Sequence, residues 1–204
     1  MKSTITEHLV PTAYGVPFEG GFYGGKIRIC DVIFAIAWAP KAFGETSSIW
    51  LPSYTQVPNA ASCFDSMANT KAMAEAGSPL GQWALSLNIN GIDDWCVPAR
   101  DVLELGYRYL KPSAEENSAL FRDGDNPSSI PAGYPYTEKF PAQTTAEAFR
   151  TGGPEAFDEV WHWSSTQYSS NYAWIQGFRD GNTGGNFKKY EARARACRMI
   201  QLTP

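Results

Sequence analysis

The sequence predicts a mixed α+β fold in which small sheets, helices and long loops follow one another along a single chain. Polar and apolar residues alternate over residues 26–29 and an apolar run follows at 32–38, a pattern typical of paired strands. Capped, helix-compatible segments lie between residues 69 and 111. The last stretch, residues 161–198, combines aromatic residues, small polar residues and glycines, and closes on alternating basic residues. We interpret it as strands joined by loops.

The composition is globular and carries no strong charge bias. The 204 residues can bury a sizeable core, and 43% of them are hydrophobic. A net charge of −4 gives no general attraction to nucleic acid or to anionic membranes. The longest apolar run, residues 32–39, is too short to span a bilayer, and the first residues contain no apolar core of a secretory signal. We therefore expect neither nucleic-acid binding nor membrane insertion.

An N-terminal arm at residues 1–25 is predicted to precede one domain at residues 26–204. The first 20 residues are polar, contain Pro11, Gly15 and Pro17, and are expected to be irregular. Such an arm is either a disordered tail or a segment ordered against a partner subunit.

The domain is predicted to open with a β-hairpin over residues 26–39. Cys30–Asp31 would form its turn, and Val32–Trp38 has the continuous apolar and β-branched character of a central strand. Residues 40–64 contain three prolines and are expected to form loops.

Three helices and a short strand should follow. They are helices at 69–76 and 80–87, a strand at 95–98, and a helix that starts at 99–101 and stops at Lys111–Pro112. Ser78 and Pro79 offer the N-cap and the first-turn proline of the second helix.

Residues 112–160 are expected to form a long connection with little regular structure, because they carry six prolines and show little periodicity. Thr144–Phe149 is the one short helix that we predict there. Asp123–Asn126 resembles the start of a calcium loop, but the closing Glu is missing and Pro127 occupies a ligand position. We expect no metal and no cofactor, and a structural calcium ion remains the alternative.

The four cysteines, Cys30, Cys63, Cys96 and Cys197, include no C-x-x-C pair, so a zinc ribbon or a thioredoxin-type site is not expected. Each lies in an apolar context, which favours buried free thiols. A disulfide would require maturation outside a reducing cytosol.

We predict that the protein has no catalytic centre. It contains only two histidines, and His162 lies between two tryptophans at an expected strand start. The serines that follow, Ser164 and Ser165, are interpreted as hydrogen-bonding local backbone. A nucleophile elbow and a phosphate-loop lysine are both missing from the sequence. An enzyme built on a triad through His162 is the competing class.

Three arginines near the chain end, Arg193, Arg195 and Arg198, are separated by small residues. We interpret this as a strand whose small residues pack inward while the arginines pair with acidic residues. A basic stripe that reads nucleic acid is the alternative, and the net charge argues against it.

Three motifs in order resemble those of a phage and bacterial domain family that includes the C-terminal domain of bacterial collagen-like adhesins. Trp95–Leu105 resembles its "W-x-x-P-(S/A)-R-x-E-L" helix start, and Trp163–Thr166 resembles its "(Y/W)-W-S-S-T" strand. Ala173–Arg198 resembles its closing "A-W…F…G…V-R-x-V-R" pattern. The likeness covers about residues 64–200. Val102 replaces the usual acidic residue, and Cys197 stands where an aliphatic residue is common.

This resemblance implies a C-type-lectin-like fold, with small twisted antiparallel sheets, flanking helices and long loops. It also implies a phage tail protein that is made in the host cytoplasm, resides in the virion tail and binds a host surface receptor, either a glycan or a protein. Relatives of this kind are often trimers, so we expect a homotrimer with residues 1–30 at its interface, in contact with other tail proteins. A structural tail or capsid decoration protein without a receptor role is the alternative.

The receptor site is predicted in loops at residues 167–187. We expect Trp163, Trp174 and Phe178 in the core as a framework that holds these loops. Tyrosine offers contact area at low entropic cost, asparagine adapts its hydrogen bonds, and arginine offers a planar fork for carboxylate or phosphate. An ordinary solvated loop is the alternative. The predicted binding residues are Tyr168, Asn171, Tyr172, Gln176, Arg179, Asn182, Asn186 and Phe187.

Overall fold

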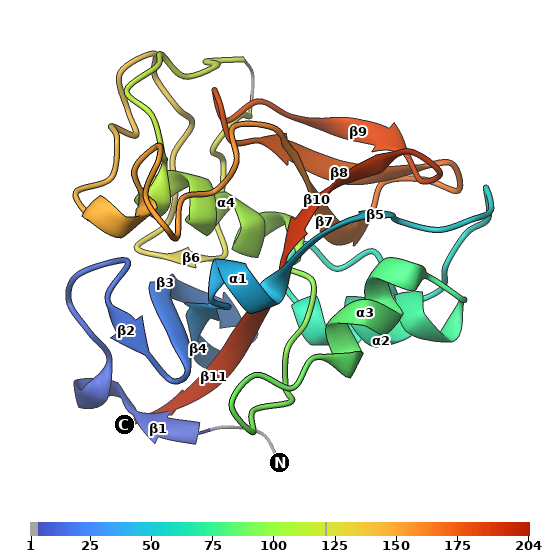
Figure 1. Ribbon diagram of the computed structural model, residues 1–204, viewed down its shortest axis with the longest axis horizontal. Coiled ribbons are helices and arrows are strands. Elements are labelled where there is room, and N and C mark those ends of the chain that lie inside the picture. Colours follow the sequence, from blue (N-terminus) through green and yellow to red (C-terminus); the bar gives the residue numbers. More distant parts are fainter. Residues whose placement is uncertain (1–3, 121) are drawn as a thin grey trace.

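The computed structural model describes residues 4–120 and 122–204, and this part of the chain is a mixed α+β structure (Figure 1). Two sheets lie on either side of the helix α4, Arg100–Leu110, which contacts strands of both. The predicted α+β class is therefore confirmed.

The first sheet has the strand order β1-β11-β4-β3-β2, and β6 pairs with β3. Its strands are β1 Thr4–Thr6, β2 Pro17–Phe18, β3 Gly21–Ile29, β4 Val32–Trp38, β6 Ser129–Ile130 and β11 Cys197–Thr203. The predicted hairpin is confirmed, with Ile29 opposite Val32 across a turn at Cys30–Asp31. The apolar strand β4 is central, as its composition predicts, because both of its edges are paired.

The second sheet has the order β5-β10-β7-β8-β9. Its strands are β5 Glu45–Ile49, β7 Trp161–Gln167, β8 Tyr172–Gly177, β9 Thr183–Phe187 and β10 Glu191–Arg195. The prediction of strands near the chain end is confirmed by β10 and β11. One residue, Ala196, separates these two strands, so the chain passes directly from one sheet to the other.

All three predicted helices are present, as α2 Ser66–Glu75, α3 Pro79–Ser86 and α4. Ser78 caps α3 as predicted, because its Oγ accepts a hydrogen bond from Gly81 N at 3.0 Å. The same hydroxyl donates to Trp50 O at 2.5 Å and so joins α3 to the second sheet.

The main core lies between α4 and the first sheet. Val102 and Leu105 of α4 pack with Ile36 and Trp38 of β4, all fully buried. A second cluster around Trp50 and Trp163 joins α2 and α3 to the second sheet. Trp163 and Phe178 are fully buried, which confirms their predicted place in the core.

The N-terminal region differs from the predicted irregular arm. Thr4–Thr6 forms β1 parallel to β11, and β3 begins at Gly21, so the expected boundary after residue 25 falls inside a strand. The Thr-Ile-Thr alternation was a strand signal, but its partner lies at the far end of the chain, which local patterns do not show. Residues 1–3 of the arm lie outside the described part.

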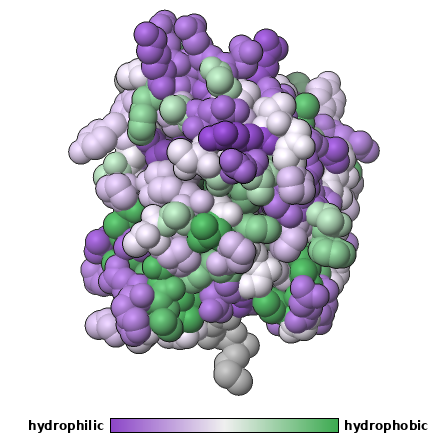
Figure 2. All heavy atoms as spheres, turned by 60° about the vertical axis from the view of Figure 1, so that its left-hand side comes forward, coloured by the Kyte–Doolittle hydropathy of each residue, from purple (hydrophilic) through white to green (hydrophobic). Residues whose placement is uncertain are grey.

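Other expectations need smaller corrections. Residues 40–64 contain α1, Lys41–Gly44, and β5 as well as loops. Residues 95–98 form only a single bridge, Cys96 to Cys197, rather than a strand. Within 112–160 the predicted helix shrinks to a 3₁₀ turn at Glu147–Phe149. Apart from β6, the described remainder of this segment has little regular structure, and parts of it form the upper end of the molecule in Figure 1, where Figure 2 shows hydrophilic side chains.

The cysteines divide into two groups. Cys96 and Cys197 are buried free thiols, as predicted, with their Sγ atoms 3.8 Å apart. Cys30 is exposed and Cys63 is half-buried, so the prediction is wrong for these two. Cys30 occupies the hairpin turn with φ of 52°, beyond the last paired residues of the two strands.

Candidate functional site

The predicted binding residues lie mainly on a β-hairpin, because β8 and β9 occupy most of residues 172–187. The side chains of a strand alternate between its two faces. Ala173 and Ile175 of β8 point into the core, while Tyr172, Trp174 and Gln176 point to the other face. We call this second face, together with its β9 partners Phe187, Gly185 and Thr183, the hairpin face.

Trp174 is only half-buried, which corrects its predicted place in the core. Its cross-strand partner is Gly185, which has no side chain to cover the indole. Tyr168 contacts the indole ring edge-on, with ring centroids 4.8 Å apart. Arg100 is on α4, and its guanidinium lies 5.5 Å from the centroid of the Trp174 ring, which is a cation–π distance. Trp174 therefore joins the hairpin face to the first turn of α4.

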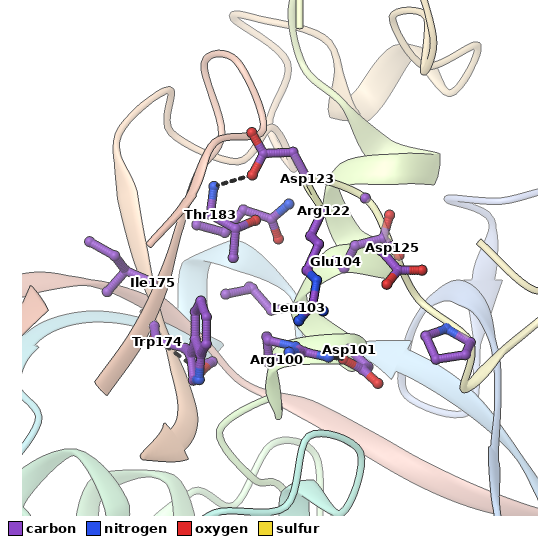
Figure 3. Close-up of a pocket in the computed structure, with 14 residues that line it drawn as sticks. Arg100, Asp101, Leu103, Glu104, Arg122, Asp123, Asp125, Trp174, Ile175 and Thr183 are labelled. Carbon is purple, nitrogen blue, oxygen red and sulfur yellow. Dashed lines mark hydrogen bonds and ion pairs between the residues drawn. The ribbon is translucent and has the colours of Figure 1, made fainter. Parts of the chain in front are cut away.

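A cavity of about 280 Å³ opens beside Trp174, between the first turn of α4, the segment 122–127 and the strands β8 and β9. In Figure 3, Trp174 lies on one side of this cavity and Asp101 and Asp125 lie on the other, with Arg122 between them. We call it the α4 pocket. Its lining residues are Arg100, Asp101, Leu103, Glu104, Arg122, Asp123, Gly124, Asp125, Pro127, Ser164, Trp174, Ile175, Gln176 and Thr183.

Side chains from distant segments fix the start of α4. The Thr166 Oγ1 atom of β7 accepts a hydrogen bond from Arg100 N at 2.9 Å, and Ser66 Oγ accepts one from Ala99 N at 2.8 Å. Both donors would otherwise lack an intrahelical partner. Arg100 also pairs with the buried Asp101, whose Oδ1 lies 2.7 Å from Nη2. Burial raises the pKa of Asp101, and Arg100 opposes that shift.

The wall of the pocket at residues 122–127 is held by a buried polar network on α4. Glu104 accepts hydrogen bonds from Asn126 Nδ2 and Tyr136 OH, both at 2.7 Å, and pairs with Arg108 at 2.8 Å. Arg108 in turn donates to the carbonyl of Gly124 at 2.5 Å. Burial raises the pKa of Glu104, and Arg108 works against this. The long loop is thus tied to the helix although it has little regular structure.

The residues that resemble a calcium loop take part in this wall. Asp123 accepts hydrogen bonds from Ser118 Oγ at 2.7 Å and from Thr183 N at 3.1 Å, and so binds the loop to β9. Asn126 is fully buried and engaged with α4. Over residues 4–120 and 122–204, no three His, Cys, Asp or Glu side chains gather as a metal site would require.

The hairpin separates the eight predicted residues into two groups. Gln176, Arg179 and Asn182 lie at the end next to the α4 pocket. Gln176 lines the pocket but is buried, while Arg179 is exposed on the turn that joins β8 to β9. The opposite end holds the other five, which are Tyr168, Asn171, Tyr172, Asn186 and Phe187. The predicted site therefore combines two groups of residues that lie near opposite ends of β8, a strand of six residues.

The opposite end is an aromatic cluster. The Phe187 ring lies 4.4 Å from Tyr172, 5.5 Å from Tyr190 and 5.9 Å from Tyr54, measured between centroids. The Lys189 ammonium lies 4.5 Å from the Tyr54 ring centroid. Sequence reasoning missed Tyr54, because nothing local connects residue 54 with residue 187.

A buried lysine holds this aromatic end together. Lys188 is fully buried, and its Nζ donates to Thr55 O at 2.8 Å and to Gln167 Oε1 at 2.6 Å. The ammonium also lies 4.7 Å from the Trp50 ring centroid. Burial lowers the pKa of Lys188 to about 8. Lys188 thereby ties the segment around Tyr54 to the hairpin.

The arginines near the chain end are paired with acidic residues, as interpreted from the sequence. Arg193 lies 2.9 Å from Asp158, Arg195 pairs with Glu155, and Arg198 pairs with Asp94. Arg195 and Arg198 are themselves buried, so these charges hold the two sheets and their loops together.

His162 is a strand residue of β7, also as interpreted. It is fully buried and lies 4.5 Å from Phe178 and 5.7 Å from Phe157, measured between ring centroids. Its Nδ1 lies 3.0 Å from Val160 O, and its Nε2 has no hydrogen-bond partner in the described part of the chain. Burial lowers the pKa of His162 to about 4. Ser164 Oγ donates instead to the backbone of Trp174, at 3.0 Å.

No protein-family model, curated protein or solved structure matches this chain. Among residues 4–120 and 122–204, no helix has the length and apolar character needed to cross a membrane.

Proposed function

We propose that this protein is a receptor-binding protein of a phage tail, with a C-type-lectin-like fold, and that the hairpin face is its receptor site. The observation that carries this proposal is the half-buried indole of Trp174, which lies opposite Gly185 and beside the α4 pocket, so that part of it can reach a ligand. Binding sites are often placed on segments held by a rigid scaffold, where an aromatic side chain borders a pocket that also contains polar groups.

The chemistry of the face fits a host glycan or an exposed host protein. Trp174 and Tyr172 offer flat apolar surface, while Arg100, Asp123 and Asp125 add planar charged groups at the pocket. Planar groups of this kind form directional hydrogen bonds to hydroxyl and amide groups. The mixed signs of charge at the pocket favour a polar ligand over a strongly anionic one.

Binding without catalysis is part of this proposal. His162 is enclosed by Phe157 and Phe178, and burial disfavours its protonated form. These contacts suit a core residue better than a general base. We further propose a homotrimer in the virion tail, because repeated weak sites gain avidity when they are linked.

The experiment that tests this proposal uses Tyr172 and Arg179, which lie at opposite ends of β8. Each is replaced by Ala, singly and together, and binding of the labelled protein to host cells is measured. A hot spot at either end should weaken binding by about 2 kcal/mol, roughly 30-fold. Tyr134→Ala is the matched control, because Tyr134 is 76% exposed in the separate loop 112–160.

The outcome also distinguishes the structural alternative. If the folded double variant binds cells as well as the parent, the hairpin face is not the receptor site. A tail or capsid decoration protein would instead bury residues 168–186 against another virion protein. Protection of these residues from hydrogen exchange in whole virions, with unchanged cell binding by the variants, would favour that role.

A further inference from the structure

A second concave surface lies on the first sheet, away from the hairpin face. One face of this sheet packs against α4 through residues such as Ile36. The same face continues toward the β3–β4 turn, because Phe34 lies two residues before Ile36 on β4. In β11, Met199 is paired with Ile36 and Gln201 with Phe34, so these side chains share that face. Phe34, Met199 and Gln201 are only partly buried, so the helices do not fully cover this end of the sheet.

The uncovered end forms the floor of a groove of about 630 Å³. Met67 of α2 and Leu85 of α3 form its walls. Six apolar side chains line it, all partly exposed to solvent: Ile29, Val32, Phe34, Met67, Leu85 and Met199. A concave site of this size and apolar character is within the range of small-molecule sites.

The charges at the rim of the groove are unequal. Asp65, Asp93 and Asp94 lie there with one lysine, Lys71. Asp94 is neutralised by Arg198, whose Nη2 lies 3.0 Å from Oδ2. Asp65 and Asp93 therefore face a single ammonium, which leaves the rim net negative. Asp65 also caps α2 by accepting a hydrogen bond from Ala68 N at 3.0 Å, so its carboxylate is held in place.

We propose that this groove binds a small cationic amphiphile. The apolar body of the ligand lies on Phe34, Met67 and Met199, and the protonated amine of the ligand faces Asp65 and Asp93. Burial of the apolar body supplies the driving force, and the net negative rim selects the charge of the head group. This site is independent of the receptor site on the hairpin face.

Methionine methyl groups give a direct readout. The protein is labelled with ¹³C-methyl methionine and titrated with octylammonium, octanol and octyl sulfate, which share one body and differ in head charge. Met67 and Met199 lie in the groove, whereas Met73 is fully buried in the second core cluster and serves as the internal reference. Saturable shifts at Met67 and Met199 are expected, with octylammonium binding about 10-fold more tightly than octyl sulfate.

Two variants distinguish recognition of the apolar body of the probe from recognition of its charged head group. Leu85→Gln should weaken all three probes, because it removes an apolar wall. Asp93→Asn should leave octanol unchanged and reduce the preference for octylammonium about 3-fold. Equal binding of octylammonium and octyl sulfate would overturn the proposal, as would equal shifts at Met73, which indicate general detergent action. Shifts caused by an apolar lysine-containing peptide but not by octylammonium would also overturn it.

Discussion

The two ends of the β8–β9 hairpin are held in place by different physical means. At the pocket end, Glu104 and Arg108 on α4 form a buried ion pair that organises the neighbouring loop. At the aromatic end, the Lys188 ammonium contacts two neutral acceptors and the Trp50 ring, and no carboxylate pairs with it within the described part of the chain. One end thus depends on a compensated charge and the other on an uncompensated one. The two ends should therefore respond differently to mutation and to pH.

The largest effect is expected at the pocket end, from Glu104→Gln. This change leaves the Arg108 guanidinium buried without a counter-charge, which should lower the free energy of unfolding by about 3–5 kcal/mol. Urea denaturation measures the loss, and hydrogen exchange should show faster opening of residues 122–136. Asp125→Asn, on the exposed part of the same wall, is the control and should cost under about 0.5 kcal/mol. Equal losses in the two variants would show that the network does not hold the loop.

The second largest effect is expected in acid, which should destabilise the pocket end through His162. This residue lies on β7 and is paired with Gln176 of β8. Its pKa is lowered to about 4 in the folded protein, so between pH 6.5 and 4 the unfolded chain binds the extra proton. Stability should therefore fall across this window, by about 3 kcal/mol in total. His162→Gln should remove this part of the acid dependence, whereas His8→Gln, at an exposed position, should not. Identical pH profiles for the parent and His162→Gln would contradict the assignment.

Alkali should stabilise the aromatic end through Lys188. The pKa of Lys188 is lowered to about 8, below its ordinary value of 10.5. Between these values the unfolded chain holds the proton that the folded protein releases, so stability rises with pH, by about 2 kcal/mol between pH 8 and 10. Lys188→Met should abolish this rise, and Lys189→Met, at the exposed neighbouring position, should preserve it. A rise that persists in Lys188→Met would place its origin elsewhere.

Local patterns predicted much of the fold. The hairpin at 26–39 and the helices α2, α3 and α4 follow from alternation, caps and breakers within a few residues of one another. The pairing of β1 with β11 could not be predicted in this way, because nearly the whole chain separates the two strands. The aromatic and polar residues of the hairpin also stood out, because they are close in sequence.

The α4 pocket could not be predicted, because its walls come from stretches near residues 100, 124, 164, 175 and 183, which are far apart in the sequence. In the sequence, Arg100 and Asp101 indicate only the start of a helix. Trp174 was expected in the core because tryptophan is highly buried on average. Its partial exposure depends on Gly185 lying opposite, and only the register of β8 with β9 reveals that.

Trp174 lies between the two ends of the hairpin face, so its removal tests the central claim most directly. Because the indole is only half-buried, Trp174→Ala should leave the protein folded, which thermal unfolding verifies. Binding of the labelled protein to host cells should weaken by about 2 kcal/mol or more, roughly 30-fold, as expected when a central aromatic contact is lost. A folded Trp174→Ala protein that binds host cells with the affinity of the parent would contradict the account.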